Sequence, residues 1–255
     1  MPGSVEAQAG TVPVIALPER TITPRHSVLV RVTHWIVTLS FLALLVSGAE
    51  IITSHPRFYW GETGNDLTEP LFKIPIPASR NLVPTGYGYT LPDQNGWSRA
   101  LHFQTAWVLT LTGLLYVISG FFSGHFRKDL VPGKRELSWR GMASVIAHHL
   151  RLGRSAEDPW SYNVLQRLTY LLVIFVLFPM VIWTGLALSP AFDSAFPATV
   201  NLLGGRQSAR TLHFLVTVAL VVFLTVHVVL VWRSGFWSRM RAMITGKASS
   251  TGERV

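Results

Sequence analysis

Four histidines lie inside long apolar stretches of the sequence: His34, His102, His213 and His227. An ionisable side chain within such a stretch is costly to bury, which makes each one a candidate for function. His213 and His227 are fourteen residues apart, so on a helix they lie about 40° apart around the axis and about 21 Å apart along it. One face of a single helix therefore offers imidazoles at two depths.

The other two histidines match these two depths. His34 lies near the start of the first apolar stretch, and His102 lies near the start of the second. Because consecutive spans run in opposite directions, His34 shares its level with His227, whereas His102 shares its level with His213. The spacing predicts two cross-helix pairs, one near the inner surface of a membrane and one near the outer surface.

Two neutral imidazoles on opposite sides of an iron suit a six-coordinate haem b held among apolar side chains. We therefore predict two haems b stacked across the bilayer, the inner one held by His34 and His227 and the outer one by His102 and His213. An arginine precedes three of these histidines by three residues, about one helical turn towards water, where a guanidinium group is suited to pair with haem propionates. These arginines are Arg31, Arg99 and Arg210.

Other roles for the histidines are less favoured by the composition of the spans. A proton or substrate path usually adds intramembrane carboxylates, and only Glu50, near an outer helix end, is a candidate. A site for a metal ion alone is disfavoured because each level supplies just two imidazoles. His55 is a reserve ligand for the outer haem. For the glycines of the spans we favour plain helix packing over making room for porphyrin; they are Gly48, Gly113, Gly120 and Gly185.

Four stretches are long enough to cross a hydrocarbon core about 30 Å thick, which takes roughly 20 apolar residues. We expect a single all-α domain over residues 1–255, an integral membrane four-helix bundle. Its helices are expected over about residues 28–52, 100–123, 165–189 and 209–232, with a long outer loop over 53–99.

The orientation follows from the basic residues. Sixteen of the 22 lysines and arginines lie in the N-terminal segment, the connection between the second and third spans, and the C-terminal tail. The positive-inside rule then makes both termini cytoplasmic. The N-terminal segment lacks the pattern of a cleavable signal peptide, so the first span is expected to be retained. Residues 139–150 have the spacing of an amphipathic helix at the lipid interface.

Composition excludes several classes of protein. Charged residues make up only 14% of the chain, against about a quarter in soluble domains, and 49% of residues are hydrophobic. The net charge of +9 does not indicate nucleic-acid binding, because the basic residues line neither a groove nor a helix face. The chain has no cysteine, which excludes iron–sulfur ligation and c-type haem attachment.

The placement of the histidines, one in each of the first two helices and a fourteen-residue pair in the fourth, resembles the four-helix, two-haem cytochrome b family. That family includes formate dehydrogenase gamma subunits and nickel–iron hydrogenase cytochrome b subunits. The branch called thiosulfate reductase cytochrome b subunits is the most similar, judged by two motifs and the long outer loop. The motifs are His55-Pro-Arg-Phe-Tyr-Trp-Gly61 and Gly204-Gly-Arg-Gln-Ser-Ala-Arg-Thr-Leu-His213.

The resemblance implies a multi-pass protein of the bacterial cytoplasmic membrane that exchanges electrons with membrane quinone beside the inner haem. A family motif before the third helix is matched by Tyr162-Asn163-Val164-Leu165-Gln166, so Asn163 and Gln166 are candidate quinone ligands by resemblance. Their amides are able to bond a quinone carbonyl. The alternative is that the segment caps the third helix and anchors it with Arg167.

The expected function is transfer of electrons between the quinone pool and a periplasmic redox partner, which the resemblance implies is a molybdopterin oxidoreductase. The long outer loop is either a cap over the bundle or a docking surface for that partner. The alternative function is a self-sufficient membrane oxidoreductase whose outer haem reacts with a small oxidant such as superoxide. A histidine-lined transporter without haem is a third, less favoured class.

Overall fold

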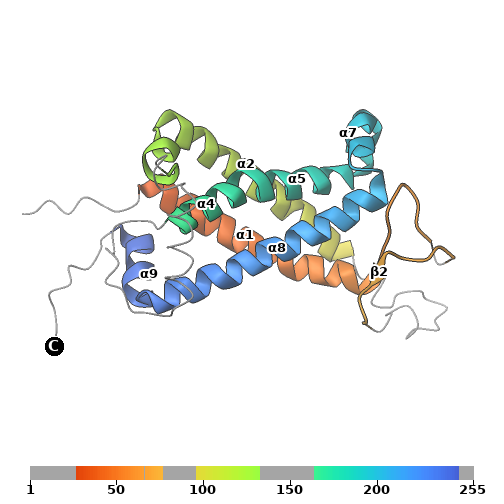
Figure 1. Cartoon of the computed structure of the whole chain (residues 1–255), viewed down its shortest axis with the longest axis horizontal. Coiled ribbons are helices and arrows are strands. Elements are labelled where there is room, and N and C mark those ends of the chain that lie inside the picture. The colour runs from red at the N-terminus through yellow and green to blue at the C-terminus, as the bar shows by residue number, and fades with distance from the viewer. Residues whose placement is uncertain (1–26, 66, 77–95, 133–163, 247–255) are drawn as a thin grey trace, which may run out of the picture.

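The computed structural model describes residues 27–65, 67–76, 96–132 and 164–246. Within these ranges four helical stretches are long and apolar enough to cross a membrane. They confirm the expected all-α membrane bundle (Figure 1). The four are α1 (Val28–Ser54), α2 (Gly96–Phe122), the span Val164–Ala187, and α8 (Arg206–Arg233).

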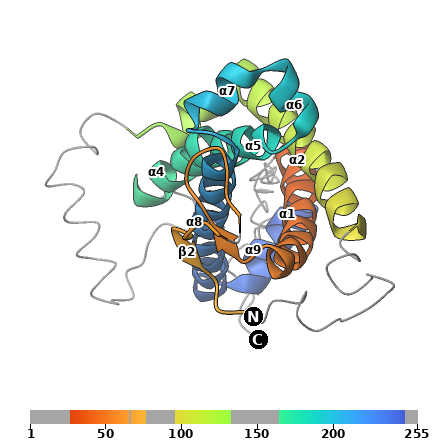
Figure 2. The ribbon, with the colours of Figure 1, turned by 90° about the vertical axis from the view of Figure 1, so that its right-hand side faces the viewer.

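The spans lie along the long axis of the molecule and alternate in direction (Figure 1). They pack as two pairs, α1 along α2, and α5 (Phe178–Ala187) along α8. Seen along the bundle, α1 and α2 lie side by side and α8 lies across from them (Figure 2). The start of α1 and the end of α8 lie at the same end of the bundle, which the basic residues assign to the cytoplasm.

Small residues allow the first pair to pack closely. The buried residues of α1 recur every seven positions and all carry a hydroxyl group: Thr33, Ser40, Ser47 and Ser54. Those of α2 are Ser98, Leu109 and Gly120. Small side chains let transmembrane helices approach each other, and a hydroxyl can return its hydrogen bond to its own helix, as Thr33 does to Leu29.

The third span is not the uninterrupted helix that we expected over residues 165–189. It consists of α4 (Val164–Leu172), the π-helical turn η4 (Val173–Leu177) and α5. Pro179 explains the change, because proline has no N–H to donate and its ring clashes with the carbonyl four residues earlier. The wider turn avoids that clash, and the Phe178 N–H bonds to the Val173 carbonyl, five residues back.

A small cap covers the outer end of the bundle. Strands β1 (Arg57–Phe58) and β2 (Phe72–Lys73) form an antiparallel pair in which Phe58 lies opposite Phe72. Two short helices, α6 (Pro190–Ala195) and α7 (Pro197–Leu202), join the third span to α8. The described part of the outer loop therefore folds over the helices, which agrees with the expectation of a cap over the bundle.

The inner end carries the π-helical turn η3 (Phe126–Leu130) and the short helix α9 (Phe236–Thr245), which turns from the end of α8 towards the start of α1 (Figure 1). Helix α9 is fixed to α1 through its carboxyl end. Arg31 donates from Nη1 to the Ile244 carbonyl at 2.7 Å, and Trp35 donates from Nε1 to the Met243 carbonyl at 3.3 Å. The amphipathic helix expected over residues 139–150 lies outside the described residues.

The spans bury little of their surface within the chain. In the most apolar window of α8 only 6% of residues are buried, and the largest share for any span is 17%. In water such a surface would be unfavourable, whereas a bilayer solvates it. The helix backbones pack closely within each of the two pairs, α1 with α2 and α5 with α8. A cofactor held between the pairs is therefore expected where side chains of one pair meet side chains of the other.

Candidate functional site

The outer histidines meet between the two helix pairs. His102 comes from α2 and His213 from α8, and their ring centroids lie 6.2 Å apart with the ring planes at 64°. A metal–imidazole bond is about 2.0–2.1 Å and the ring centre lies about 1.1 Å beyond the nitrogen, so two imidazoles on opposite sides of one ion have centroids about 6.3 Å apart. The two rings therefore have the separation that one iron between them requires.

A buried hydroxyl group fixes the tautomer of His102. Ser47 Oγ lies 3.0 Å from His102 Nδ1, and the Ser47 hydroxyl donates its own proton to the Ala43 carbonyl at 2.8 Å. Ser47 Oγ is thus left as an acceptor, and Nδ1 of His102 is the donor. The lone pair of this imidazole is then on Nε2, which is the form that binds a metal.

The same arrangement holds His213. Thr184 Oγ1 lies 3.1 Å from His213 Nδ1 and donates its proton to the Met180 carbonyl at 2.7 Å. His213 Nδ1 is therefore also a donor, which leaves Nε2 with the lone pair. Ser47 and Thr184 are both fully buried. Water does not compete for these two bonds.

Glycines stand directly behind both rings. A Cβ on Gly48 would lie 3.5 Å from His102 Cε1, and a Cβ on Gly185 would lie 3.1 Å from His213 Cε1. These two glycines pack against a side chain of the neighbouring helix, which agrees with the helix packing that we expected for them. Gly120 does pack on a neighbouring side chain, that of Phe126, and Gly113 has open space where its Cβ would be.

The two halves of the outer site thus repeat one pattern, a hydroxyl residue followed by glycine on one helix and a histidine on the next. The sequence carries this signal as Ser47-Gly48 and Thr184-Gly185. Neither hydroxyl residue was predicted from the sequence, because serine and threonine carry no charge and do not stand out within an apolar span.

The outer arginines converge on His55. Arg99 donates from Nη2 to His55 Nε2 at 3.2 Å, and Arg210 donates from Nη2 to the His55 carbonyl. The Arg210 guanidinium also lies 5.1 Å above the ring of the buried Phe58. A guanidinium has five donors, so both arginines keep donors for a carboxylate. The bond from Arg99 occupies the Nε2 lone pair of His55, which disfavours His55 as a ligand of the outer haem.

The cap is fixed to the first turns of α8, just above His213. The Gly61 carbonyl accepts from the N–H groups of Gln207 and Ser208 at 3.0 and 3.2 Å, and Glu62 Oε2 accepts from the Arg206 N–H at 3.1 Å. These bonds satisfy N–H groups that the start of a helix leaves without a partner. The two motifs that carry the branch resemblance therefore dock onto each other.

The inner histidines are placed on the expected helices, His34 in α1 and His227 in α8. His227 stacks on Phe223 with centroids 5.7 Å apart, and its ring lies edge-on to Tyr170 of α4 at 6.3 Å. His34 lies edge-on to Trp35 at 5.4 Å. Among the described ring contacts there is none between His34 and His227, so the inner pairing stays a prediction.

One buried nitrogen at the inner level fits an anionic group. Arg31 Nε is buried and has no hydrogen-bond partner within the described part of the chain, although Nη1 caps α9. A buried donor without an acceptor is rare in proteins and indicates a missing ligand, ion or water. A propionate is suited to fill that position. Of the candidate quinone ligands, Gln166 lies in the first turn of α4, and Asn163 lies outside the described residues.

Comparison with known proteins decides the family. Residues 25–246 match the family model described as prokaryotic cytochrome b561. The chain belongs to this family. Prokaryotic cytochromes b561 are membrane proteins, and the four apolar helices agree with a multi-pass protein of the bacterial inner membrane.

Relatives of this cytochrome b561 are subunits of redox complexes. A putative protein-methionine-sulfoxide reductase subunit YedZ1 from Azospira oryzae is 31% identical over 81% of this chain and 89% of its own length. A probable Ni/Fe-hydrogenase B-type cytochrome subunit from Azotobacter vinelandii is 26% identical over 84% of this chain and 82% of its own length. No solved structure matches. The expected family is confirmed, and its thiosulfate reductase branch stays a prediction.

As a cytochrome b561, this chain is a membrane b-type cytochrome that transfers electrons, and its cofactor is haem b. The residues present fit that group: two imidazoles at the separation set by one iron, both with the tautomer fixed by a buried hydroxyl, and arginines at the outer end for propionates. Gly48 and Gly185 carry no Cβ, so each ring lies close to the backbone of the neighbouring helix.

The hydroxyl of Thr184 gives a direct test of the outer site. Thr184→Val removes the acceptor for His213 Nδ1–H, and we expect haem binding at the outer site to weaken about 10–100-fold, as for other partners of metal-ligating histidines. The measurement is the ratio of haem to protein after dialysis against apomyoglobin. Thr217→Val is the matched control, because Thr217 Oγ1 bonds only the His213 carbonyl at 2.8 Å. Equal haem retention in both variants would refute this role of Thr184.

Proposed function

We propose that the chain is a di-haem electron-transfer subunit that connects a quinone site at the inner membrane surface with a catalytic oxidoreductase docked at the outer end. The observation that carries the proposal is the paired geometry of His102 and His213. A second pair is supported by His227, which lies fourteen residues from His213 on the uninterrupted helix α8, about 21 Å along its axis. His34 on α1 is the partner that depth assigns to it.

Haem b, when bound, supplies one-electron oxidation and reduction at each level. The chain's own residues hold and separate the two levels. Imidazoles of α2 and α8 supply the outer ligands, and His34 and His227 supply the inner ones. The apolar spans exclude water, and Arg31, Arg99 and Arg210 balance the propionate charge. Because His213 and His227 lie at different depths on α8, the two haem sites together give electrons a route across the bilayer.

The partner is expected to contain the substrate site. The described residues form the spans with a small cap and short inner elements, and the chain has no cysteine to hold an iron–sulfur centre. Two relatives are named as subunits of a protein-methionine-sulfoxide reductase and of a Ni/Fe hydrogenase, which supports a catalytic partner here. The resemblance of the outer-cap motifs implies that this partner is a molybdopterin-type oxidoreductase.

The quinone site is proposed at the start of α4. Gln166 lies in the first helical turn, at the inner end, and Asn163 immediately precedes the helix. Tyr170, one turn further along, contacts the His227 ring. If the Gln166 amide bonds a quinone carbonyl, the quinone lies about one helical turn from Tyr170, which contacts the inner ligand His227.

The test is reduction of the purified, haem-loaded chain by a quinol, followed by its reduced-minus-oxidised spectrum. We expect two b-type components and a several-fold slower reduction in Gln166→Leu. Gln207→Leu at the outer end is the matched control, because Gln207 Oε1 has no bond to lose within the described residues. Absence of b-type bands would refute the proposal. Oxidation of the isolated chain by superoxide at catalytic rates would favour the self-sufficient oxidoreductase instead.

A further inference from the structure

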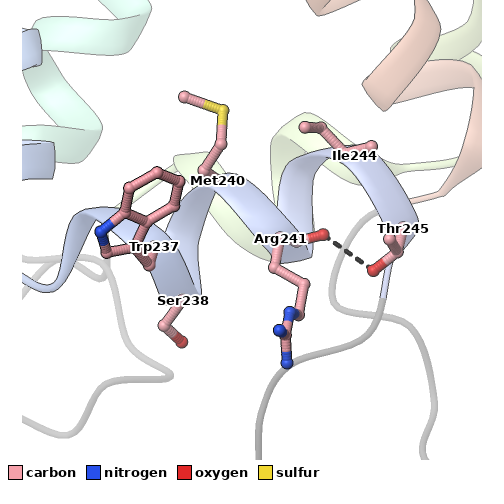
Figure 3. A pocket seen from close by; sticks show the side chains of 6 residues that line it. All are labelled: Trp237, Ser238, Met240, Arg241, Ile244 and Thr245. Atoms are coloured by element: carbon pink, nitrogen blue, oxygen red, sulfur yellow. Dashed lines mark hydrogen bonds between the residues drawn. The ribbon is translucent and has the colours of Figure 1, made fainter.

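A pocket of about 630 Å³ lies beside α9 at the inner end of the bundle (Figure 3). Trp237, Met240 and Ile244 project from one side of the helix, whereas Arg241 and Ser238 project from the other (Figure 3). Thr245 completes the lining. A helix with an apolar edge and a cationic edge suits a position at the membrane surface.

The apolar edge of this pocket has no cover from the described chain. The side chains of Trp237 and Ile244 are 81% and 59% exposed, whereas Ala242 is 5% exposed. Helix α9 is already fixed to α1 by the bonds from Arg31 and Trp35 to its last carbonyls. Its packing therefore leaves the Trp237 edge available to a molecule outside the bundle.

Charge at this end favours an anionic molecule. The carboxylates whose side chains the structure describes all belong to the outer half of the bundle: Glu50, Glu62, Glu69 and Asp193. Arg241 is exposed and forms no ion pair with the described residues. It lies beyond the end of α8, where the hydrocarbon core gives way to the headgroup region. The inner leaflet of a bacterial membrane presents anionic headgroups at that depth.

We propose that this pocket binds one anionic phospholipid of the inner leaflet. The acyl chain lies along Trp237, Met240 and Ile244, and the phosphate group contacts Arg241. The volume is within the range of sites that hold small molecules, about 300–1,000 Å³, and suits a headgroup with the upper part of its chains. The site uses none of the residues assigned to electron transfer, so it stands independently of the proposed function.

Native mass spectrometry of the full, haem-loaded chain tests the proposal. Delipidated protein is titrated with phosphatidylglycerol or with phosphatidylcholine of the same acyl chains. We expect the first phosphatidylglycerol to bind about fivefold more tightly, the contribution of one arginine near a membrane surface. Arg241→Gln should remove that preference, and Trp237→Ala should weaken both lipids. The control variant Lys73→Gln, which removes a cation of the outer cap, should keep the preference.

Four results would overturn the proposal. One is equal affinity of the wild-type chain for the two lipids, and another is an unchanged preference in Arg241→Gln. The third is loss of bound phosphatidylglycerol to millimolar inorganic phosphate or glycerol phosphate, which would make the pocket a site for a free phosphate group. Displacement by a quinone analogue at equal concentration would likewise refute a lipid site.

Discussion

Replacing His213 with alanine is expected to reduce the haem content of the purified chain from two haems to one, and His102→Ala is expected to remove the same haem. The two rings lie at the separation that one iron sets, so loss of either leaves the other without its opposing ligand. His34→Ala and His227→Ala should together affect the other haem. Haem content and the reduced-minus-oxidised spectrum of each variant measure the grouping.

The control for these variants is His55→Gln. His55 lies near the outer level but accepts a hydrogen bond from Arg99, so its loss should leave both haems in place. A different grouping, for example loss of one haem by His102→Ala and His227→Ala alike, would overturn the topology on which the pairing rests. Loss of the outer haem in His55→Gln with retention in His102→Ala would transfer the ligand role to the reserve candidate.

Gly205→Ala is expected to destabilise the chain by about 2–4 kcal/mol, through backbone strain and a collision together. Gly205 precedes α8 with φ 100° and ψ 173°, a region of backbone conformation that is almost restricted to glycine. A Cβ at this position would lie 2.6 Å from Glu62 Oε2 and 2.8 Å from the Gly61 carbonyl carbon. The cap would have to move off the start of α8.

Gly61→Ala separates the two causes. Gly61 has φ 104°, close to that of Gly205, but an added Cβ would meet nothing within 4 Å. It should therefore cost only the strain, about 1–2 kcal/mol. The measurement is the thermal unfolding midpoint of the haem-loaded protein in detergent, together with its outer haem content, because Arg210 and His213 follow on the same helix. Equal losses in the two variants would refute a collision at Gly205.

The sequence predicted the parts of this protein that depend on local patterns. Apolar length identified the four spans, and the fourteen-residue spacing placed two imidazoles on one face of α8. The partners of those imidazoles were not predictable in the same way. Ser47 meets His102 across 55 residues of chain and Thr184 meets His213 across 29, and a hydroxyl group inside a span changes the hydropathy pattern little.

Other differences have identifiable causes. Pro179 lies inside the third span, but a proline alone does not distinguish a kink from a π-helical turn. Helix α9 is too short and too mixed in composition to count as a span, so the sequence pattern does not predict it. The cap depends on bonds between two motifs about 150 residues apart, such as Gly61 N–H to Ser208 Oγ, which no local pattern indicates.

The π-helical turn η4 lets the third span hold one residue more than an α-helix of the same reach. Such a turn accommodates one residue more than an α-helix would, so every side chain beyond it is rotated by about 100° relative to an uninterrupted helix. Thr184 and Gly185 lie beyond η4, and both contact His213. Deletion of a single residue from Val173–Leu177 would let the segment close as an α-helix with Thr184 still facing the imidazole, whereas insertion of a further residue would rotate the hydroxyl group away from it. Homologous chains that keep the threonine–glycine pair should therefore tolerate the loss of one residue in this segment but not a further insertion.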